Sequence, residues 1–352
     1  LWPQENQVLF KRLNASDGLS NNWIRCIYMD DVGYMWFGTA DGLNKYDGHG
    51  FSIYRPKTMS GKSIGNINVS GVLKKSKHEL WVCTDLGVFI YNYMDDELHP
   101  FALMRKWAIL CVIEDREHKF WFGTSNGLHR YDPVSETLAS YNHNPADASS
   151  ISHSYINIVF EDSNGNIWVG SKSGISLFIK RTNSFINYRP HDIAVGKSTN
   201  DVAWIREDYN KRLWVGYGEE GLYAFRINSI PTVEFYKVMD GKIMKLLVDT
   251  HNNLWIGKGS GQGLDKMPLD HYTLGDEPVY QHFRHDPNDP QSLGDNSLYS
   301  LYEDKFNDIW IGTFGNGINY YSNRAKKFNV VDENSGRIIK IQNNLINAFT
   351  ED

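Results

Sequence analysis

Apolar and polar positions along the chain form short blocks that return at regular intervals. Segments such as "DVGYMWFGTADGLNKY" and "DIWIGTFGNGINYY" share one order: a polar turn, an apolar run with a Trp, a second turn and another apolar run. Seven Trp residues occupy this shared slot, at intervals of 40 to 55 residues: Trp36, Trp81, Trp121, Trp168, Trp214, Trp255 and Trp310. Because self-similarity at such a period indicates a repeat architecture, each block is one structural unit.

Each unit predicts four short strands. The first is an apolar run such as residues 24–29, which is too short for a helix and ends at an Asp. The second carries the slot Trp and, two residues later, a Gly such as Gly38, which lets a neighbouring backbone approach closely. The third opens at a Gly such as Gly42, and aromatic pairs such as Phe51 with Tyr54 mark the fourth.

Four antiparallel strands recurring seven times predict an all-β fold, a seven-bladed β-propeller of four-stranded antiparallel blades. The rival is a parallel β-helix, whose repeats are shorter and lack paired tight turns. The slot Trp is expected to pack between blades, because a large ring fills the wedge between twisted sheets. Four other Trp residues stand outside the slot: Trp2, Trp23, Trp107 and Trp204. Of these, Trp204 is expected to plug the central channel.

The ends of the chain predict how the propeller closes. The segment 8–13, "VLFKRL", is expected to complete the outer edge of the seventh blade, whereas the alternative uses residues 328–331. Closure is required because an open end leaves unpaired strand edges. "NNLINAFTED" at the end of the chain resembles "NNWIRCIYMD" near its start, so we expect a propeller over residues 1–340 and the start of a further repeat over 341–352.

Composition limits the classes of function. The chain of 352 residues is 41% hydrophobic with a net charge of −6, which indicates a folded protein and argues against a nucleic-acid surface. No apolar stretch reaches the length of a membrane-spanning helix. The three cysteines lie in predicted strands and are expected to be buried thiols: Cys26, Cys83 and Cys111.

No constellation of residues predicts catalysis. Carboxylates recur with the turns, as in Glu161-Asp162, Glu207-Asp208 and Glu303-Asp304, and are expected to be solvated or to cap those turns. His282 and His285 lie three residues apart in a Pro- and Asp-rich loop, so no metal site is predicted there. We expect no catalytic residue, no cofactor and no metal. A propeller lyase or hydrolase stays open as an alternative, since fold does not dictate function.

The repeat pattern of Asp, turn Gly, Trp, a second Gly and a third Gly resembles the two-component regulator propeller repeat. Segments such as "KFWFGTSNGLHRYD" and "NIWVGSKSGISLF" carry the resemblance, and "FKRLNASDGLSNNWIRCIYMDD" is similar to the N-terminal edge of such sensor regions. In "ELWVCTDLGVF" Cys83 replaces the Gly, which departs from the pattern. The resemblance implies the periplasmic sensor region of a bacterial hybrid two-component system, which detects oligosaccharides from complex glycans and signals to a histidine kinase.

The partners implied are an oligosaccharide, further propeller and signalling domains of the same chain, and a second copy in a homodimer. No nucleic acid is expected in this part, and the membrane is reached only through domains outside it. A scaffold propeller that binds no ligand is the main alternative.

If a ligand binds this propeller, we expect it at the channel mouth, where the inner strands begin. Rings stack on the apolar faces of sugars and planar polar groups meet their hydroxyls. Six residues are candidates: Trp23, Arg25, Trp107, Tyr155, Asn157 and Tyr299. The competing interpretation is that the two Trp residues merely cover blade ends, and the family resemblance also allows sites at junctions with later domains.

Overall fold

The computed structural model describes residues 10–57, 62–190, 200–227 and 230–322. The chain divides into two compact units, Leu1–Tyr321 and Ser322–Asp352. The predicted repeat start at 341–352, the alternative closing strand at 328–331 and Trp2 lie outside the described residues.

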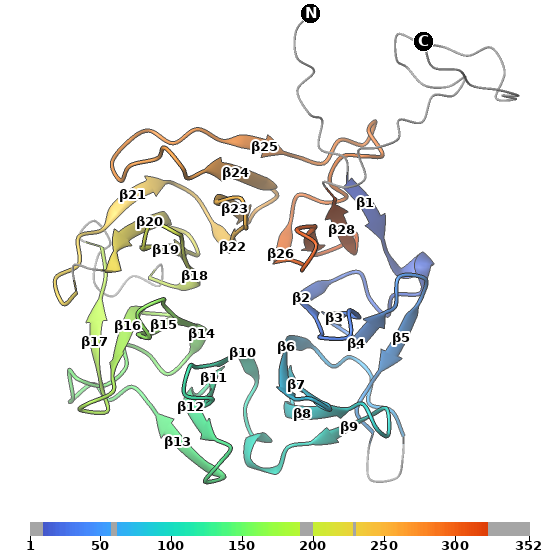
Figure 1. Cartoon of the computed structure of the whole chain (residues 1–352), viewed down its shortest axis with the longest axis horizontal. Coiled ribbons are helices and arrows are strands. Elements are labelled where there is room, and N and C mark those ends of the chain that lie inside the picture. Colours follow the sequence, from blue (N-terminus) through green and yellow to red (C-terminus); the bar gives the residue numbers. More distant parts are fainter. Residues whose placement is uncertain (1–9, 58–61, 191–199, 228–229, 323–352) are drawn as a thin grey trace, which may run out of the picture. The chain divides into compact units, whose positions relative to one another are not determined.

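Within the first unit, the described strands form seven four-stranded antiparallel sheets arranged around a central axis (Figure 1). The predicted all-β, seven-bladed propeller is therefore confirmed. Blades one to four comprise β2 (Ile24–Met29), β3 (Met35–Thr39), β4 (Gly42–Tyr46) and β5 (Phe51–Tyr54); β6 (Val69–Ser76), β7 (Glu79–Thr84), β8 (Gly87–Asn92) and β9 (Glu97–Pro100); β10 (Ile109–Glu114), β11 (Phe120–Thr124), β12 (Gly127–Asp132) and β13 (Thr137–Tyr141); and β14 (Ile156–Glu161), β15 (Ile167–Ser171), β16 (Gly174–Ile179) and β17 (Ser184–Tyr188).

Blades five to seven follow the same order from the inner to the outer strand. They comprise β18 (Val202–Glu207), β19 (Arg212–Tyr217), β20 (Gly221–Arg226) and β21 (Tyr236–Met239); β22 (Ile243–Val248), β23 (Asn253–Lys258), β24 (Leu264–Pro268) and β25 (Gln281–Phe283); and β26 (Leu298–Glu303), β27 (Ile309–Thr313), β28 (Ile318–Tyr321) and β1 (Phe10–Leu13). Two short 3-10 helices, η1 (Ala15–Asp17) and η2 (Ala102–Met104), complete the described elements.

The first described strand closes the ring. β1 pairs antiparallel with β28, from Phe10 opposite Tyr321 to Leu13 opposite Ile318. Arg12 also donates from Nη2 to the carbonyl oxygen of Ser292, at 2.7 Å. The predicted closure by the N-terminal segment is therefore confirmed for the residues that the structure describes.

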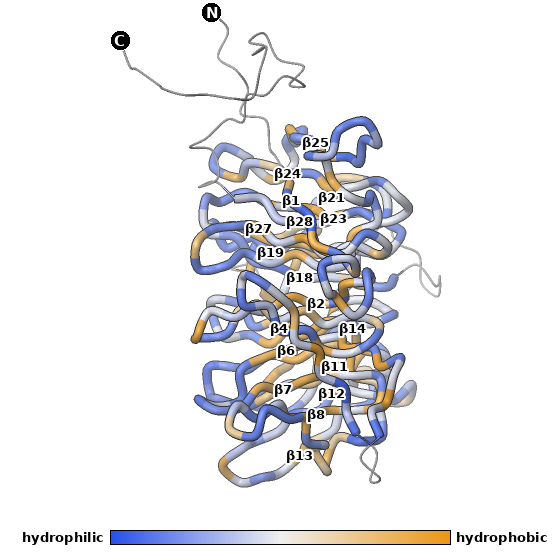
Figure 2. Tube along the Cα trace, turned by 90° about the vertical axis from the view of Figure 1, so that its right-hand side faces the viewer, coloured by the Kyte–Doolittle hydropathy of each residue, from blue (hydrophilic) through white to orange (hydrophobic). Residues whose placement is uncertain are grey.

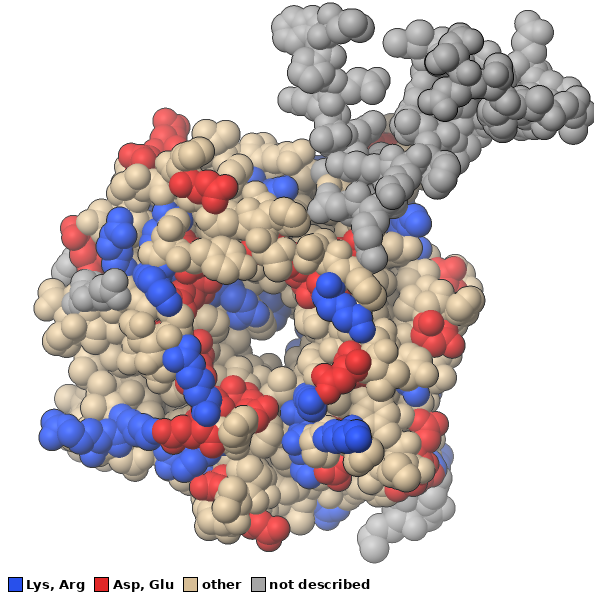
Figure 3. Space-filling view, viewed as in Figure 1, with Lys and Arg blue, Asp and Glu red and all other residues tan. Residues whose placement is uncertain are grey.

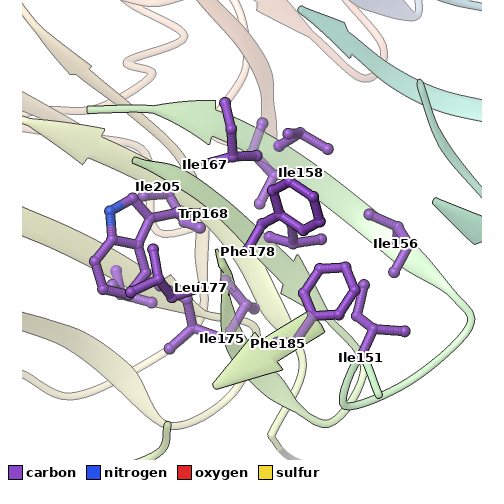
Figure 4. Packing of buried hydrophobic residues seen from close by; sticks show 14 of the residues in the cluster. Ile151, Ile156, Ile158, Ile167, Trp168, Ile175, Leu177, Phe178, Phe185 and Ile205 are labelled. Carbon is purple, nitrogen blue, oxygen red and sulfur yellow. The ribbon is translucent and has the colours of Figure 1, made fainter. Parts of the chain in front are cut away.

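The seven slot Trp side chains are all buried, as predicted. Trp168 belongs to blade four, yet its indole lies 5.3 Å from the ring of Phe225 in blade five and packs in one cluster with Ile205 (Figure 4). Along the Cα trace, apolar residues gather in the strands and polar residues in the loops (Figure 2). The core therefore consists of layers between neighbouring sheets rather than one central cluster.

Six of the slot indoles donate to a buried Asp six residues earlier, which we call the turn Asp: Asp30, Asp115, Asp162, Asp208, Asp249 and Asp304. In blade four, Asp162 Oδ2 accepts from Trp168 Nε1 at 2.8 Å, while Oδ1 accepts from the backbone N–H of Asn164 and Asn166. The prediction that these carboxylates cap turns is confirmed, but solvation is wrong, because the turn Asp is buried.

The Glu that precedes a turn Asp has a different partner. Glu207 accepts from the backbone N–H of Ser163 at 2.6 Å, and Glu303 accepts from that of Thr250 at 2.9 Å. Each Glu thus caps the turn of the preceding blade. The carboxylate pairs therefore fasten a blade internally and also to its neighbour.

Blade two departs from this scheme at two positions. Lys75 stands where the turn Asp is expected, and the buried Nε1 of Trp81 has no hydrogen-bond partner among the described residues. Cys83 replaces the usual Gly, but Gly71 lies opposite it on β6. In blade one the arrangement is reversed, since Cys26 lies opposite Gly38. Each cross-strand pair thus contains one Gly, which leaves room for the Cys side chain opposite it. The replacement of Gly by Cys83 is therefore compensated by Gly71 on the neighbouring strand.

The Gly after the slot Trp is required by close packing, as predicted. A Cβ on Gly38 would lie 2.4 Å from Cys26 Sγ and 2.5 Å from the carbonyl oxygen of Val69 on the next blade. The carbonyl oxygen cannot move away without shifting a strand. The backbones of neighbouring blades therefore approach each other closely at this position.

Replacing the turn Asp tests its contribution to stability. Asp162→Ala would leave the indole N–H and two turn amides unsatisfied, so we expect a loss of about 2 to 3 kcal/mol in the free energy of unfolding. Lys75→Ala at the equivalent position of blade two removes a half-buried ion pair with Glu79 and a contact of Nζ with the Trp81 ring, 5.3 Å from its centre, and we expect a loss of about 1 kcal/mol. Urea denaturation of both variants checks this, and equal losses would contradict the assigned role of Asp162.

Candidate functional site

The inner strands share an irregularity that shapes the channel wall. In all seven described blades the pairing between the first and second strands shifts by one residue near its start, which is a β-bulge. The residues at the bulge are Arg25, Ser70, Leu110, Asn157, Ala203, Met244 and Tyr299. Bulges commonly re-aim a side chain. Three of the six candidates therefore occupy one structurally equivalent position.

An aromatic cluster forms where blades seven and one meet. The ring of Trp23 lies 5.3 Å from that of Tyr299 and 4.8 Å from that of Phe314. The guanidinium of Arg25 lies 4.9 Å from the centre of the Trp23 ring. We call Trp23, Arg25, Tyr299 and Phe314 the mouth cluster. It brings together three of the six candidate residues.

The mouth cluster has an exposed aromatic ring and two N–H donors without a partner among the described residues. Phe314 is 48% exposed, although it is a large apolar side chain. Trp23 Nε1 and Arg25 Nε are buried and have no hydrogen-bond acceptor among the described residues. An apolar face with two unpaired donors suits a ligand that has both an apolar face and oxygen acceptors.

The other three candidates lie in blades three and four with their own partners. Trp107 stacks on His129, with the ring centres 4.3 Å apart. Lys172 lies over the ring of Tyr155 at 4.0 Å. Asn157 donates from Nδ2 to the carbonyl oxygen of Val202 at 3.0 Å and also to Asp201. The structure thus distributes the six candidates over three local groups, and their shared role in ligand binding stays a prediction.

Basic side chains from three blades meet in the channel. Lys245 Nζ lies 3.5 Å from the centre of the Trp204 ring, and the Arg206 guanidinium lies 4.9 Å from it. Burial, together with the nearby charge of Arg206, lowers the pKa of Lys245 to about 7. Burial alone lowers the pKa of Arg206 to about 10. Figure 3 shows an open central channel whose mouth is bordered by both basic and acidic side chains, so the prediction that Trp204 plugs the channel is wrong.

Sequence reasoning did not identify Lys245 and Arg206. Each is the only basic residue at its position among the seven inner strands, Lys245 four residues and Arg206 two residues before the turn Asp. A comparison of equivalent positions could have found them, because all other blades have uncharged side chains there.

Cys83 and Cys111 are buried, as predicted, whereas Cys26 is only partly buried. Burial raises the pKa of Cys26 and of Cys111 to about 12, and it raises the pKa of Cys83 as well. All three cysteines are free thiols. They therefore carry no negative charge that could offset the basic residues of the channel.

His282 and His285 have separate structural partners. His282 Nδ1 lies 2.8 Å from Asp265, and His285 Nδ1 lies 2.6 Å from the carbonyl oxygen of Leu293. Within the described ranges no group of three or more His, Cys, Asp or Glu side chains is arranged to hold a metal ion. In the same ranges no helix is long and apolar enough to cross a membrane.

Two shallow cavities of about 250 and 240 Å³ lie between blades one and two. The first is bordered by Tyr28, Lys74 and Tyr93, and the second by Arg55 and Glu97. Neither is lined by a residue of the mouth cluster. The channel and its mouth therefore remain the best-supported candidate site.

Comparison with known proteins finds a family model that matches three segments of this chain. The family model described as "Two component regulator propeller" matches residues 18–41, 150–173 and 292–315. Histidine kinase P4 of Formosa agariphila is 28% identical over 238 residues, which cover 65% of this chain and 17% of that protein.

Solved structures give the same picture. The extracellular domain of a putative hybrid two-component system of B. thetaiotaomicron is 25% identical with a TM-score of 0.75, covering 90% of this chain and 42% of that one. Virginiamycin B lyase from Staphylococcus aureus shares the fold alone, with 12% identity, a TM-score of 0.65, and coverage of 90% of this chain and 99% of the lyase.

The fold and repeats define a seven-bladed β-propeller whose channel and mouth are lined by aromatic and basic residues. More particularly, three of its repeats match the family model described as "Two component regulator propeller", and the chain resembles the extracellular domain of a putative hybrid two-component system. The chain spans 17% of the curated relative and less than half of the similar extracellular domain.

Proposed function

We propose that this propeller is part of the periplasmic sensor region of a hybrid two-component system and recognises an oligosaccharide released from a complex glycan. Binding would be passed to a histidine kinase in another part of the same protein. The similarity to an extracellular domain of this class supports the proposal, as does the curated histidine kinase relative.

The mouth cluster is the observation that carries the proposal. The rings of Trp23, Tyr299 and Phe314 form one apolar surface, and the unpaired Nε1–H of Trp23 lies beside it. Pyranose rings offer C–H faces that pack on aromatic rings, while their hydroxyl oxygens accept hydrogen bonds. A saccharide therefore matches both halves of the surface, and the propeller binds it without a chemical step.

Calorimetric titration of the 352-residue chain with a panel of neutral oligosaccharides tests this function. We expect one member of the panel to bind and Trp23→Ala to weaken that binding about tenfold, which equals about 1.4 kcal/mol. Tyr209→Ala is the matched control, because Tyr209 is a 63% exposed aromatic residue in the turn at the opposite end of an inner strand.

Three outcomes oppose the proposal in different ways. Unchanged affinity in Trp23→Ala would remove the mouth cluster as the site. Cleavage of the bound oligosaccharide would favour a lyase or hydrolase instead. If no member of the panel binds, the scaffold alternative is favoured. The variant Trp107→Ala shows whether the stacked pair in blade three belongs to the same site.

A further inference from the structure

Three basic side chains lie on inner strands, two of them on neighbouring blades and the third on a blade remote in the sequence. Arg25 lies on β2, Arg206 on β18 and Lys245 on β22. The described residues include no carboxylate that forms an ion pair with any of them. All three side chains are half-buried, and taking an ion even partly out of water is costly when no opposite charge is nearby. This group of cations therefore has positive charge that no carboxylate of the described residues balances.

The indole of Trp204 brings two of these cations together. Lys245 Nζ and the Arg206 guanidinium both lie within 5 Å of its ring centre, at 3.5 and 4.9 Å. Cation–aromatic contacts stabilise each charge but do not neutralise it. Burial is the main cause of the lowered pKa of Lys245, and the repulsion between the two positive groups across one ring adds to it.

Hydrogen-bond donors in the same group are also unsatisfied. Arg25 Nε and Trp204 Nε1 are buried and have no acceptor among the described residues. Arg206 donates from Nη1 to the carbonyl oxygen of Ile205, its own neighbour in the strand. A water molecule could accept from one donor, but it would leave the positive charge in place. An oxyanion would satisfy donors and charge together.

The groups facing Lys245 from the other strands supply no negative charge. Arg25 and Arg206 are positive, and the thiols of Cys26 and Cys111 are protonated at neutral pH. The groups whose charge acts on the pKa of Lys245 are therefore positive or neutral.

Carboxylates near the ends of the inner strands already have partners. Glu219 pairs with Lys242 at 2.7 Å, and Asp201 accepts from Asn157. Glu207 accepts from the backbone of Ser163 at 2.6 Å. These contacts hold the acids outside the cation group.

We propose that the channel is a binding site for an oxyanion, a carboxylate or a sulfate group, held by Arg25, Arg206 and Lys245. The anion enters past Arg25, which also belongs to the mouth cluster, and reaches Lys245 and Arg206 further along the inner strands. The group is either a free inorganic anion or the acidic substituent of a sugar. This site goes beyond the proposed recognition of an oligosaccharide and does not depend on it.

Calorimetric titration of the 352-residue chain at pH 6.0 and constant ionic strength tests the site with three probes. These are sodium sulfate, methyl glucuronoside as a carboxylate on a sugar, and methyl glucoside as its neutral counterpart. We expect at least one of the two anionic probes to bind and the neutral probe not to compete with it. Binding of sulfate alone would identify an inorganic anion site, and binding of the glucuronoside alone an acidic-sugar site.

Lys245→Met supplies the decisive comparison. We expect it to weaken anion binding at least tenfold and, without any anion, to raise the melting temperature, since it removes a half-buried charge that has no ion-pair partner among the described residues. Lys106→Met is the matched control, because Lys106 is exposed and makes the same charge change. If Lys245 only supported Trp204, its replacement would lower the melting temperature and leave anion affinity unchanged, which would overturn the proposal.

The pH dependence gives a second readout. Because Lys245 has a pKa of about 7, raised when an anion is bound, affinity should be at least threefold higher at pH 6.0 than at pH 8.5. The Lys106→Met variant should keep this dependence and Lys245→Met should lose it. No binding of either anion, or equal affinity at both pH values, contradicts the site. Failure of the neutral oligosaccharide panel would leave these results untouched and would count only against the sensor proposal.

Discussion

Removal of residues 1–13 is expected to open the propeller and to cause self-association. The deletion takes away β1, so β28 loses its antiparallel partner from Phe10 to Leu13. Its N–H and C=O groups then form an exposed strand edge, which is a template for pairing with another chain. We expect oligomers in size-exclusion chromatography and a fall of several degrees in the melting temperature.

A shorter deletion provides the control for this result. Removal of residues 1–8 leaves β1 in place and is expected to keep the oligomeric state and melting temperature of the full chain. Phe10→Ala tests the packing alone, because the Phe10 ring is buried and lies 5.8 Å from that of Phe283. If the 1–13 deletion kept the oligomeric state and stability of the full chain, another segment would have to close the ring.

Trp168→Ala is expected to lower the free energy of unfolding by about 3 to 5 kcal/mol, the range for truncating a large buried aromatic side chain. The indole is fully buried between blades four and five and contacts Phe225. Its loss also leaves the buried carboxylate of Asp162 without one of its donors. Equilibrium denaturation in urea measures the change.

Val134→Ala is a suitable control, because Val134 is 93% exposed and its truncation should cost less than about 0.5 kcal/mol. Trp168→Phe separates packing from hydrogen bonding, since it keeps an aromatic ring but removes the N–H. A near-neutral Trp168→Ala would mean that the contact between blades contributes little to stability.

The sequence predicted the fold because its signals are local and repeated. The slot Trp, the Gly two residues later and the turn Asp each recur at fixed spacing, so seven weak signals reinforce one another. Closure by residues 8–13 was also predictable, since a β-propeller has no tolerated open edge.

The candidate site was less predictable, for two physical reasons. The β-bulge at Arg25, Asn157 and Tyr299 is a property of the backbone pairing and has no residue signature in these sequences. Lys245 and Arg206 come together only when the blades assemble into a ring. In the sequence, each is simply the one basic residue at a position that is uncharged in the other inner strands. A single basic residue in one repeat gives no hint of its neighbour in another.

The burial of the turn Asp could not be predicted from the sequence, for a related reason. An Asp in a polar turn is typical of a solvated loop, and only the position of the indole N–H shows why Asp162 lies inside. Blade two supports this explanation. Lys75 replaces the turn Asp there, and the Nε1–H of Trp81 has no acceptor among the described residues.

The pairing of β1 with β28 also determines when the seventh blade can form during synthesis of the chain. A ribosome adds about 5 to 20 residues per second, so roughly 15 to 60 s separate the synthesis of the two strands. During that interval the nascent chain can complete the first six sheets one after another, while the seventh waits for its last strand. β1 has no antiparallel partner during this interval. Several ribosomes on one messenger RNA hold growing copies of the chain close together, which would favour pairing of β1 with the β28 strand of another copy.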